Sequence, residues 1–195
     1  MKLISDILIY LVEVFGTLAL TLVLLRFFFQ LVRADFYNPV SQGIAKITNP
    51  VLIPLRRVIP GVFGIDIASI VLALVIQMLV GELTAFFGYG TLINPLTMLA
   101  AAVVGTLNVC TYIGLGSILI LVISSFIAPQ STNPIILLAQ QLLAPLMTPI
   151  QKAIPPMGGL DFSVMIIGIG IVVIQKIILA AAMSIGNIVT LVIGF

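Results

Sequence analysis

Two stretches of the chain resemble each other and decide its architecture. Residues 38–66 have the sequence NPVSQGIAKITNPVLIPLRRVIPGVFGID, and residues 133–161 have the sequence NPIILLAQQLLAPLMTPIQKAIPPMGGLD. Aligned without a gap, eight of the 29 positions are identical, and all but one of these are Asn, Pro, Gly or Asp. Shared hydrophobicity does not explain such matches, so the sequence predicts an internal duplication.

The duplication has an offset of 95 residues and divides the chain into a first repeat, 1–90, and a second repeat, 91–195. We call the identical polar, glycine and proline positions the repeat motif. Its pairs are Asn38 and Asn133, Pro39 and Pro134, Pro50 and Pro145, Pro54 and Pro149, Pro60 and Pro155, Gly64 and Gly159, and Asp66 and Asp161.

Composition places the chain in a membrane. It is 62% hydrophobic and only 7% charged, whereas soluble domains carry roughly 25% charged residues. Such a chain needs lipid around it, and lipid requires helices or a closed barrel. Long apolar runs predict an all-α membrane protein.

Composition also limits the function. A net charge of +2 gives no reason to expect nucleic-acid binding. The chain has no histidine and one cysteine, and it contains no Walker loop or metal-ligand cluster. We therefore expect no catalytic residue, no metal and no cofactor.

The apolar runs predict four spans, at about 4–29, 65–87, 96–128 and 163–185. The third is an uncharged run of 33 residues. At about 1.5 Å per residue it exceeds a hydrocarbon core of about 30 Å, so it must tilt, protrude or break, with Gly105 and Gly114 as possible break points. The sequence leaves open whether 91–105 is a separate helix and whether 183–195 continues the fourth span.

Charge predicts the orientation of the spans. Arg33, Lys46, Arg56 and Arg57 lie on the first connection and Lys152 on the second, while Lys2 is the basic residue on the opposite side. The positive-inside rule then places both connections in the cytoplasm and both termini outside. Two spans per repeat return the chain to its starting side, so the repeats are parallel.

Each connection has the pattern of amphipathic helices. In the first, Asn38-Pro39 predicts the start of one helix over 39–48, and Asn49-Pro50 predicts the start of a second that ends at Pro60. Pro54 should kink the second helix or delay its start.

The basic residues of the connections, Lys46, Arg56, Arg57 and Lys152, are candidates for contact with anionic lipid or a partner. The alternative is that the connections only cap the bundle and supply topology charges. Asp66 and Asp161 precede spans and are expected to serve as N-caps.

Polar residues inside the spans form a second candidate site. Glu13, Glu82, Asn108 and Lys176 lie at similar depth, about 22–24 Å from the cytoplasmic ends of their helices. We expect Lys176 to pair with Glu82 or Glu13. This layer has three interpretations: a structural clasp, a transport or proton path, or plain exposure at the interface.

The segments 26–39, RFFFQLVRADFYNP, and 49–61, NPVLIPLRRVIPG, together with the second copy of the motif, resemble the YggT (YlmG-like) family in its two-repeat bacterial form. The resemblance covers nearly the whole chain and implies a bacterial inner membrane. It implies no agreed biochemical activity; relatives are linked to osmotic or ion homeostasis, to cell division and nucleoid organisation, and in plastids to cytochrome assembly.

We therefore expect a non-enzymatic inner-membrane scaffold or assembly factor that acts through its cytoplasmic amphipathic helices. Its expected partners are the lipid bilayer, with anionic lipid at the cytoplasmic face, and further copies of itself or other membrane proteins. The alternative is a small oligomeric ion transporter or channel in osmotic or ion homeostasis.

Overall fold

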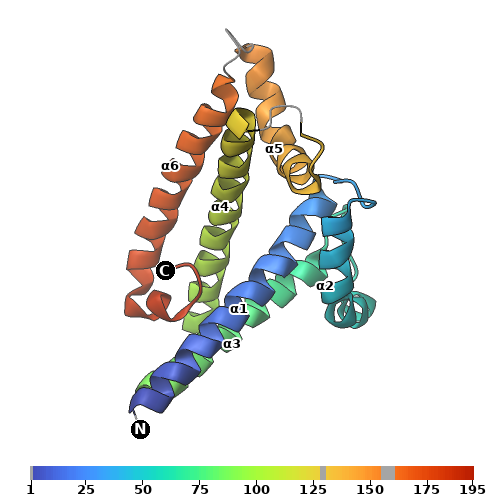
Figure 1. Ribbon diagram of the computed structural model, residues 1–195. Coiled ribbons are helices and arrows are strands. Elements are labelled where there is room, and N and C mark those ends of the chain that lie inside the picture. Colours follow the sequence, from blue (N-terminus) through green and yellow to red (C-terminus); the bar gives the residue numbers. More distant parts are fainter. Residues whose placement is uncertain (1, 128–130, 155–160) are drawn as a thin grey trace.

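The computed structural model describes residues 2–127, 131–154 and 161–195, and these residues are almost entirely helical (Figure 1). The first repeat contains α1 (Lys2–Leu31), α2 (Pro39–Val58) and α3 (Ile67–Tyr89). The second contains α4 (Pro95–Ile127), α5 (Pro134–Ala153) and α6 (Phe162–Ile185), followed by the short 3-10 helix η1 (Asn187–Leu191). The predicted fold class, all-α with tandem repeats, is confirmed.

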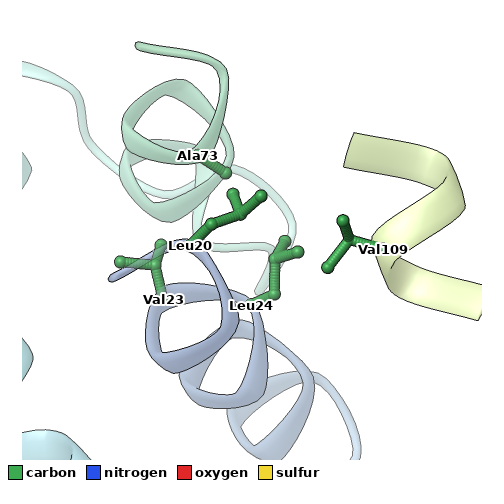
Figure 2. Close-up of a cluster of buried hydrophobic side chains, with 5 residues drawn as sticks. All are labelled: Leu20, Val23, Leu24, Ala73 and Val109. Atoms are coloured by element: carbon green, nitrogen blue, oxygen red, sulfur yellow. The ribbon is translucent and has the colours of Figure 1, made fainter. Parts of the chain in front are cut away.

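The long helices pack as two hairpins, one from each repeat. α1 packs along α3, and α4 packs along α6 (Figure 1). Leu20, Val23 and Leu24 of α1 form one buried cluster with Ala73 of α3 and Val109 of α4, as Figure 2 shows. Because this cluster draws on both repeats, it joins the two hairpins into one bundle.

Five helices are long and apolar enough to cross a membrane: α1, α3, α4, α5 and α6. Four of them run through the bundle, but α5 begins and ends at the same end of it. At its start, the side-chain nitrogen Nδ2 of Asn38 donates to the carbonyl of Pro134 over 2.8 Å. At its end, Gln151 Nε2 donates to Asp161 Oδ2, just before α6, over 2.8 Å.

α2 and α5 therefore lie across one end of the bundle, and we call them the end layer. They start side by side and run away from each other (Figure 1). A second contact reinforces this start, because the backbone N–H of Asp35 donates to Gln141 Oε1 over 2.9 Å. The end layer is thus one structure, built from both repeats.

The prediction of two helices in the first connection is wrong, since α2 is one continuous helix with Pro50 and Pro54 inside it. Both prolines are exposed, so the carbonyl groups that lose an N–H partner lie on the outer side of the helix. Buried residues on the inner side, among them Ile44 and Leu52, hold the helix against the bundle. α5 repeats this arrangement with exposed Pro145 and Pro149.

α4 is one helix, without a break at Gly105 or Gly114 and without a separate helix over 91–105. α6 ends at Ile185, where Gly186 has a φ of 83° that favours glycine. The chain then folds back against α3 and α4. The last described residues thus pack against the bundle, and the prediction that both termini face the outside of the membrane stays a prediction.

Candidate functional site

A hydrogen-bonded pair of arginine and aspartate lies where α2 meets α3. Arg56 binds the Asp66 carboxylate through two nitrogens, with Nη2 at 2.5 Å from Oδ2 and Nε at 3.3 Å from Oδ1. Ser69 Oγ donates to the same carboxylate, and Arg56 Nη2 also reaches Gln30 Oε1 at 3.0 Å. Within the described ranges this is the only ion pair. It ties the end of α2 to α1 and α3.

The charge of Asp66 is set by these partners. Burial by itself raises the pKa of this carboxyl group, but the hydrogen bonds from Arg56 and Ser69 and the positive charge of Arg56 outweigh it. The pKa of Asp66 therefore lies below its ordinary value, and the pair stays ionised at neutral pH.

The two repeat-motif aspartates do different things. Asp161 caps α6, because its Oδ1 accepts from the backbone N–H of Ser163 at 2.9 Å. Hydrogen bonds from Ser163 and Gln151 outweigh the effect of burial and lower its pKa. Asp66 makes no such side-chain cap, because Arg56 occupies its carboxylate. Both aspartates therefore stand at the predicted N-cap position, but only Asp161 makes a side-chain capping bond.

Arg26 of α1 faces the same region. Its Nη1 donates to the carbonyl of Ala45 at 3.0 Å and to Thr48 Oγ1 at 2.9 Å, both on α2. Arg26 and Arg56 line one cavity of about 330 Å³, together with the buried Ser41. We call it the repeat-one cavity.

The second repeat has a cavity in the equivalent place, which we call the repeat-two cavity. Its volume is about 350 Å³. Seven of its lining residues lie 95 positions after a lining residue of the repeat-one cavity. The pairs are Arg26 and Leu121, Phe29 and Ser124, Gln30 and Ser125, Phe36 and Ser131, Ser41 and Ile136, Ala45 and Gln140, and Arg56 and Gln151. The duplication has therefore kept the cavity and changed its chemistry.

The predicted intramembrane layer is not assembled. Glu13 and Lys176 are exposed on the outside of the bundle. Glu82 accepts a hydrogen bond from the backbone N–H of Ile93 at 3.2 Å. The expected pairing of Lys176 with Glu82 or Glu13 is wrong for the described structure, because equal depth does not bring side chains on different helix faces together. Asn108 alone faces inward, and its Nδ2 donates to the carbonyl of Gly194 at 2.5 Å.

A different set of polar residues fills the interior. Gln77, fully buried on α3, binds Ile193 with both ends of its amide: Nε2 donates to the Ile193 carbonyl and Oε1 accepts from its N–H, each at 2.9 Å. Gln175 of α6 donates to Thr111 Oγ1 at 2.8 Å. The sequence signal for these residues is an amide side chain within a long apolar run, which an interpretation based on charged residues does not consider.

The remaining predicted residues divide by position. Lys46, Arg57 and Lys152 are exposed on the end layer. Asn38 and Asn133 cap α2 and α5, accepting from Val40 and Ile135 at 2.9 Å each, with Pro39 and Pro134 in the first turn.

The rest of the repeat motif precedes α3 and α6 in the sequence. Gly64 has a φ of 83° in the turn between Val62 and Ile65, which explains a glycine there. Pro60 follows α2 and is exposed. Pro155 and Gly159 lie outside the described residues.

A family model described as CCB3/YggT matches the chain twice, over residues 5–87 and 100–182. The chain belongs to the CCB3/YggT family. The two matches fall one in each repeat, so the predicted family and its duplication are confirmed.

Relatives of similar length support this membership. "Uncharacterized protein PA0392" of Pseudomonas aeruginosa is 44% identical over 80% of this chain and 79% of its own. "Uncharacterized protein YggT" of Escherichia coli (strain K12) is 36% identical over 84% of this chain and 85% of its own. "Uncharacterized protein in proC 3'region" of Vibrio alginolyticus is 36% identical over 83% of this chain and 88% of its own. No solved structure has significant similarity to the chain.

Proposed function

We propose that this CCB3/YggT protein is a non-enzymatic scaffold or assembly factor of the bacterial inner membrane, and that the end layer is its working surface. The observation that carries the proposal is the joint placement of α2 and α5 across one end of a multi-pass bundle. The basic residues of both connections favour the cytoplasmic side for this end.

The surface of the end layer suits contact with lipid headgroups or proteins. Lys46, Arg57 and Lys152 are exposed there, and so are apolar side chains such as Ile47 and Val58. An amphipathic helix at an interface binds through buried apolar area and through attraction of basic groups to anionic lipid. Partners of this surface are expected to be anionic lipid and other membrane proteins, including further copies of the chain.

The interior also favours a scaffold over a transporter. Gln77, Asn108 and Gln175 are hydrogen-bonded to protein groups, so these amide side chains hold helices and the C-terminal segment together. A groove of about 620 Å³ between α1, α4 and the C-terminal segment has a mainly apolar lining. Ion paths need polar or charged linings, so this interior is better suited to holding helices together.

The family resemblance favours a role in osmotic or envelope homeostasis or in cell division.

Crosslinking tests the scaffold. A photo-crosslinking residue is placed at Arg57 or at Lys152 in cells, with Val173 on the exposed side of α6 as the matched position outside the end layer. Discrete protein adducts are expected from both positions. They should disappear when the other basic residues of the end layer are neutralised, which are Lys46 and Lys152 for the probe at Arg57, and Lys46 and Arg57 for the probe at Lys152.

Ion flux tests the alternative, a small oligomeric transporter or channel. Purified protein in liposomes is compared with a Glu13→Gln/Glu82→Gln/Lys176→Gln variant under a potassium gradient. The proposal expects no flux above that of empty liposomes. Flux that the folded variant loses would contradict the scaffold and favour transport.

A further inference from the structure

We propose that the repeat-one cavity binds the phosphate group of a phospholipid headgroup and that the repeat-two cavity does not. This inference deepens the lipid contact of the proposed function and rests on the position of α2 at the membrane surface. It assigns one defined lipid site to a protein whose two repeats share a common plan.

A buried hydrogen-bond donor lacks a partner in this cavity. Ser41 is only 8% exposed, and its Oγ makes no hydrogen bond to the described part of the chain. Buried hydroxyl groups in proteins are ordinarily hydrogen-bonded. A phosphate oxygen in the cavity would accept the hydrogen bond that Ser41 Oγ leaves unmade.

The charges of the cavity favour an anion. Arg56 and Asp66 neutralise each other. Arg26 donates only to the neutral oxygens of Ala45 and Thr48, and among the described residues it has no carboxylate partner. One positive charge is therefore in excess, which matches the single negative charge of a phosphodiester. Guanidinium nitrogens not used by Arg26 and Arg56 in these contacts have the planar geometry that suits phosphate oxygens.

The position of the cavity favours lipid as the source of the phosphate. Arg26 lies five residues before the end of α1, and Asp66 immediately precedes α3. The cavity is thus level with the point where both helices leave the hydrocarbon. Phe29, Phe36 and Ile44 add apolar lining, which suits the glycerol and upper acyl carbons. A volume of about 330 Å³ is small for a ligand site and fits a headgroup rather than a whole lipid.

The repeat-two cavity is a control that the duplication supplies. It is of similar size, but Leu121, Ile136 and Gln151 stand where the repeat-one cavity has Arg26, Ser41 and Arg56. Gln151 still donates to the repeat-motif carboxylate, Asp161. The second cavity therefore shows which substitutions keep the architecture while they remove the cations.

Lipid titration of the full chain tests the assignment. The purified protein in detergent is titrated with phosphatidylglycerol, and bound lipid is counted by native mass spectrometry. The variant R26L/R56Q copies the residues of repeat two, and S41A removes only the hydroxyl group. R33Q is the matched control, because Arg33 is exposed just after α1 and does not line the cavity.

We expect the parent and R33Q to bind one phosphatidylglycerol tightly, R26L/R56Q to lose about tenfold or more in affinity, and S41A to lose severalfold while its helix content is unchanged. Equal binding by all four proteins, or an equal loss in R33Q, would overturn the cavity as the site. Inorganic phosphate, titrated alone, separates the two sources: binding as tight as that of phosphatidylglycerol would overturn the lipid assignment in favour of a soluble phosphate.

The crosslinking experiment from Arg57 and Lys152 is independent of this result. Absence of adducts from both positions in the otherwise unchanged protein contradicts the scaffold, whereas equal lipid binding by the parent and R26L/R56Q contradicts only the cavity.

Discussion

Replacing Gln77 with leucine should release the C-terminal segment from the bundle. Gln77 is fully buried in the middle of α3, and its amide makes two hydrogen bonds of 2.9 Å to the backbone of Ile193. Leucine has a similar volume but makes neither bond. The N–H and carbonyl groups of Ile193 would then stay unpaired in an apolar interior, or the segment would detach.

The size of the effect follows from these two bonds. Side-chain hydrogen bonds between membrane helices are worth about 0.6 kcal/mol on average and up to about 1.7 kcal/mol. Two bonds lost together destabilise the docked segment by about 1–3 kcal/mol. Since about 1.4 kcal/mol is a factor of ten, the open population should rise by about 5-fold to 150-fold.

Hydrogen exchange measured by mass spectrometry on peptides covering 186–195 gives this population directly. Exchange should accelerate in Q77L by that factor, while peptides from α1 keep their protection. Q175L is the matched control, since Gln175 is also an intramembrane glutamine but binds Thr111 and not the C-terminal segment. Unchanged exchange over 186–195 in Q77L, or equal acceleration in Q175L, would refute the reasoning.

Three further predictions concern packing, charge and capping. A Cβ on Gly105 would lie 2.9 Å from the Ile193 carbonyl oxygen, whereas Gly116 on the same helix has open space, so G105A should lower the free energy of unfolding by about 1–3 kcal/mol and G116A should not. Thermal unfolding in detergent checks both, and equal melting temperatures would count against the close contact. The pKa of Asp66 is lowered, so its stabilisation is present at neutral pH and is lost as the pH falls below about 4 toward the lowered pKa. D66N should therefore be less stable than the parent at pH 7, and the difference should shrink in acid; a constant difference would exclude this linkage. N133A should cost about 0.5–2 kcal/mol as a lost helix cap, and N38A should cost more because Asn38 also donates to Pro134; the reverse order in denaturant unfolding would contradict the contact between α2 and α5.

The architecture was predictable because it depends on features that a sequence displays directly. Long apolar runs marked the four helices of the bundle, and identities of Asn, Pro, Gly and Asp marked the duplication. Asn-Pro pairs marked the starts of α2 and α5, because an asparagine cap followed by proline suits the first turn of a helix.

The interior of the bundle was not predictable from depth along each helix. Depth placed Glu13 and Lys176 at one level with Asn108, but it did not specify the direction in which each side chain points. The partners of Gln77 and Asn108 lie 116 and 86 residues away. Both partners are backbone groups, and the amino-acid sequence does not indicate which backbone group a side chain will bind.

The interhelical pair of Arg56 and Asp66 was missed for a similar reason. Asp66 precedes a helix and has the sequence context of an N-cap, which Asp161 fulfils. An arginine ten residues earlier competes for the carboxylate, and only the packing of α2 against α3 decides which contact forms. The repeat itself held a clue, because Arg56 changes to Gln151 at the same offset while Asp66 is kept as Asp161.

The position of α5 is the most direct test of the end layer, because α5 is long and apolar enough to cross a membrane. Single cysteines replace Thr132, before α5, and Lys152, near its end, in a Cys110→Ala background. A membrane-impermeant thiol reagent is then applied to intact spheroplasts and to inverted membrane vesicles. Labelling of both cysteines in inverted vesicles only is the predicted result, since the proposed function places α5 on the cytoplasmic side. Labelling of the two cysteines from opposite sides would mean that α5 spans the membrane and would contradict the end layer.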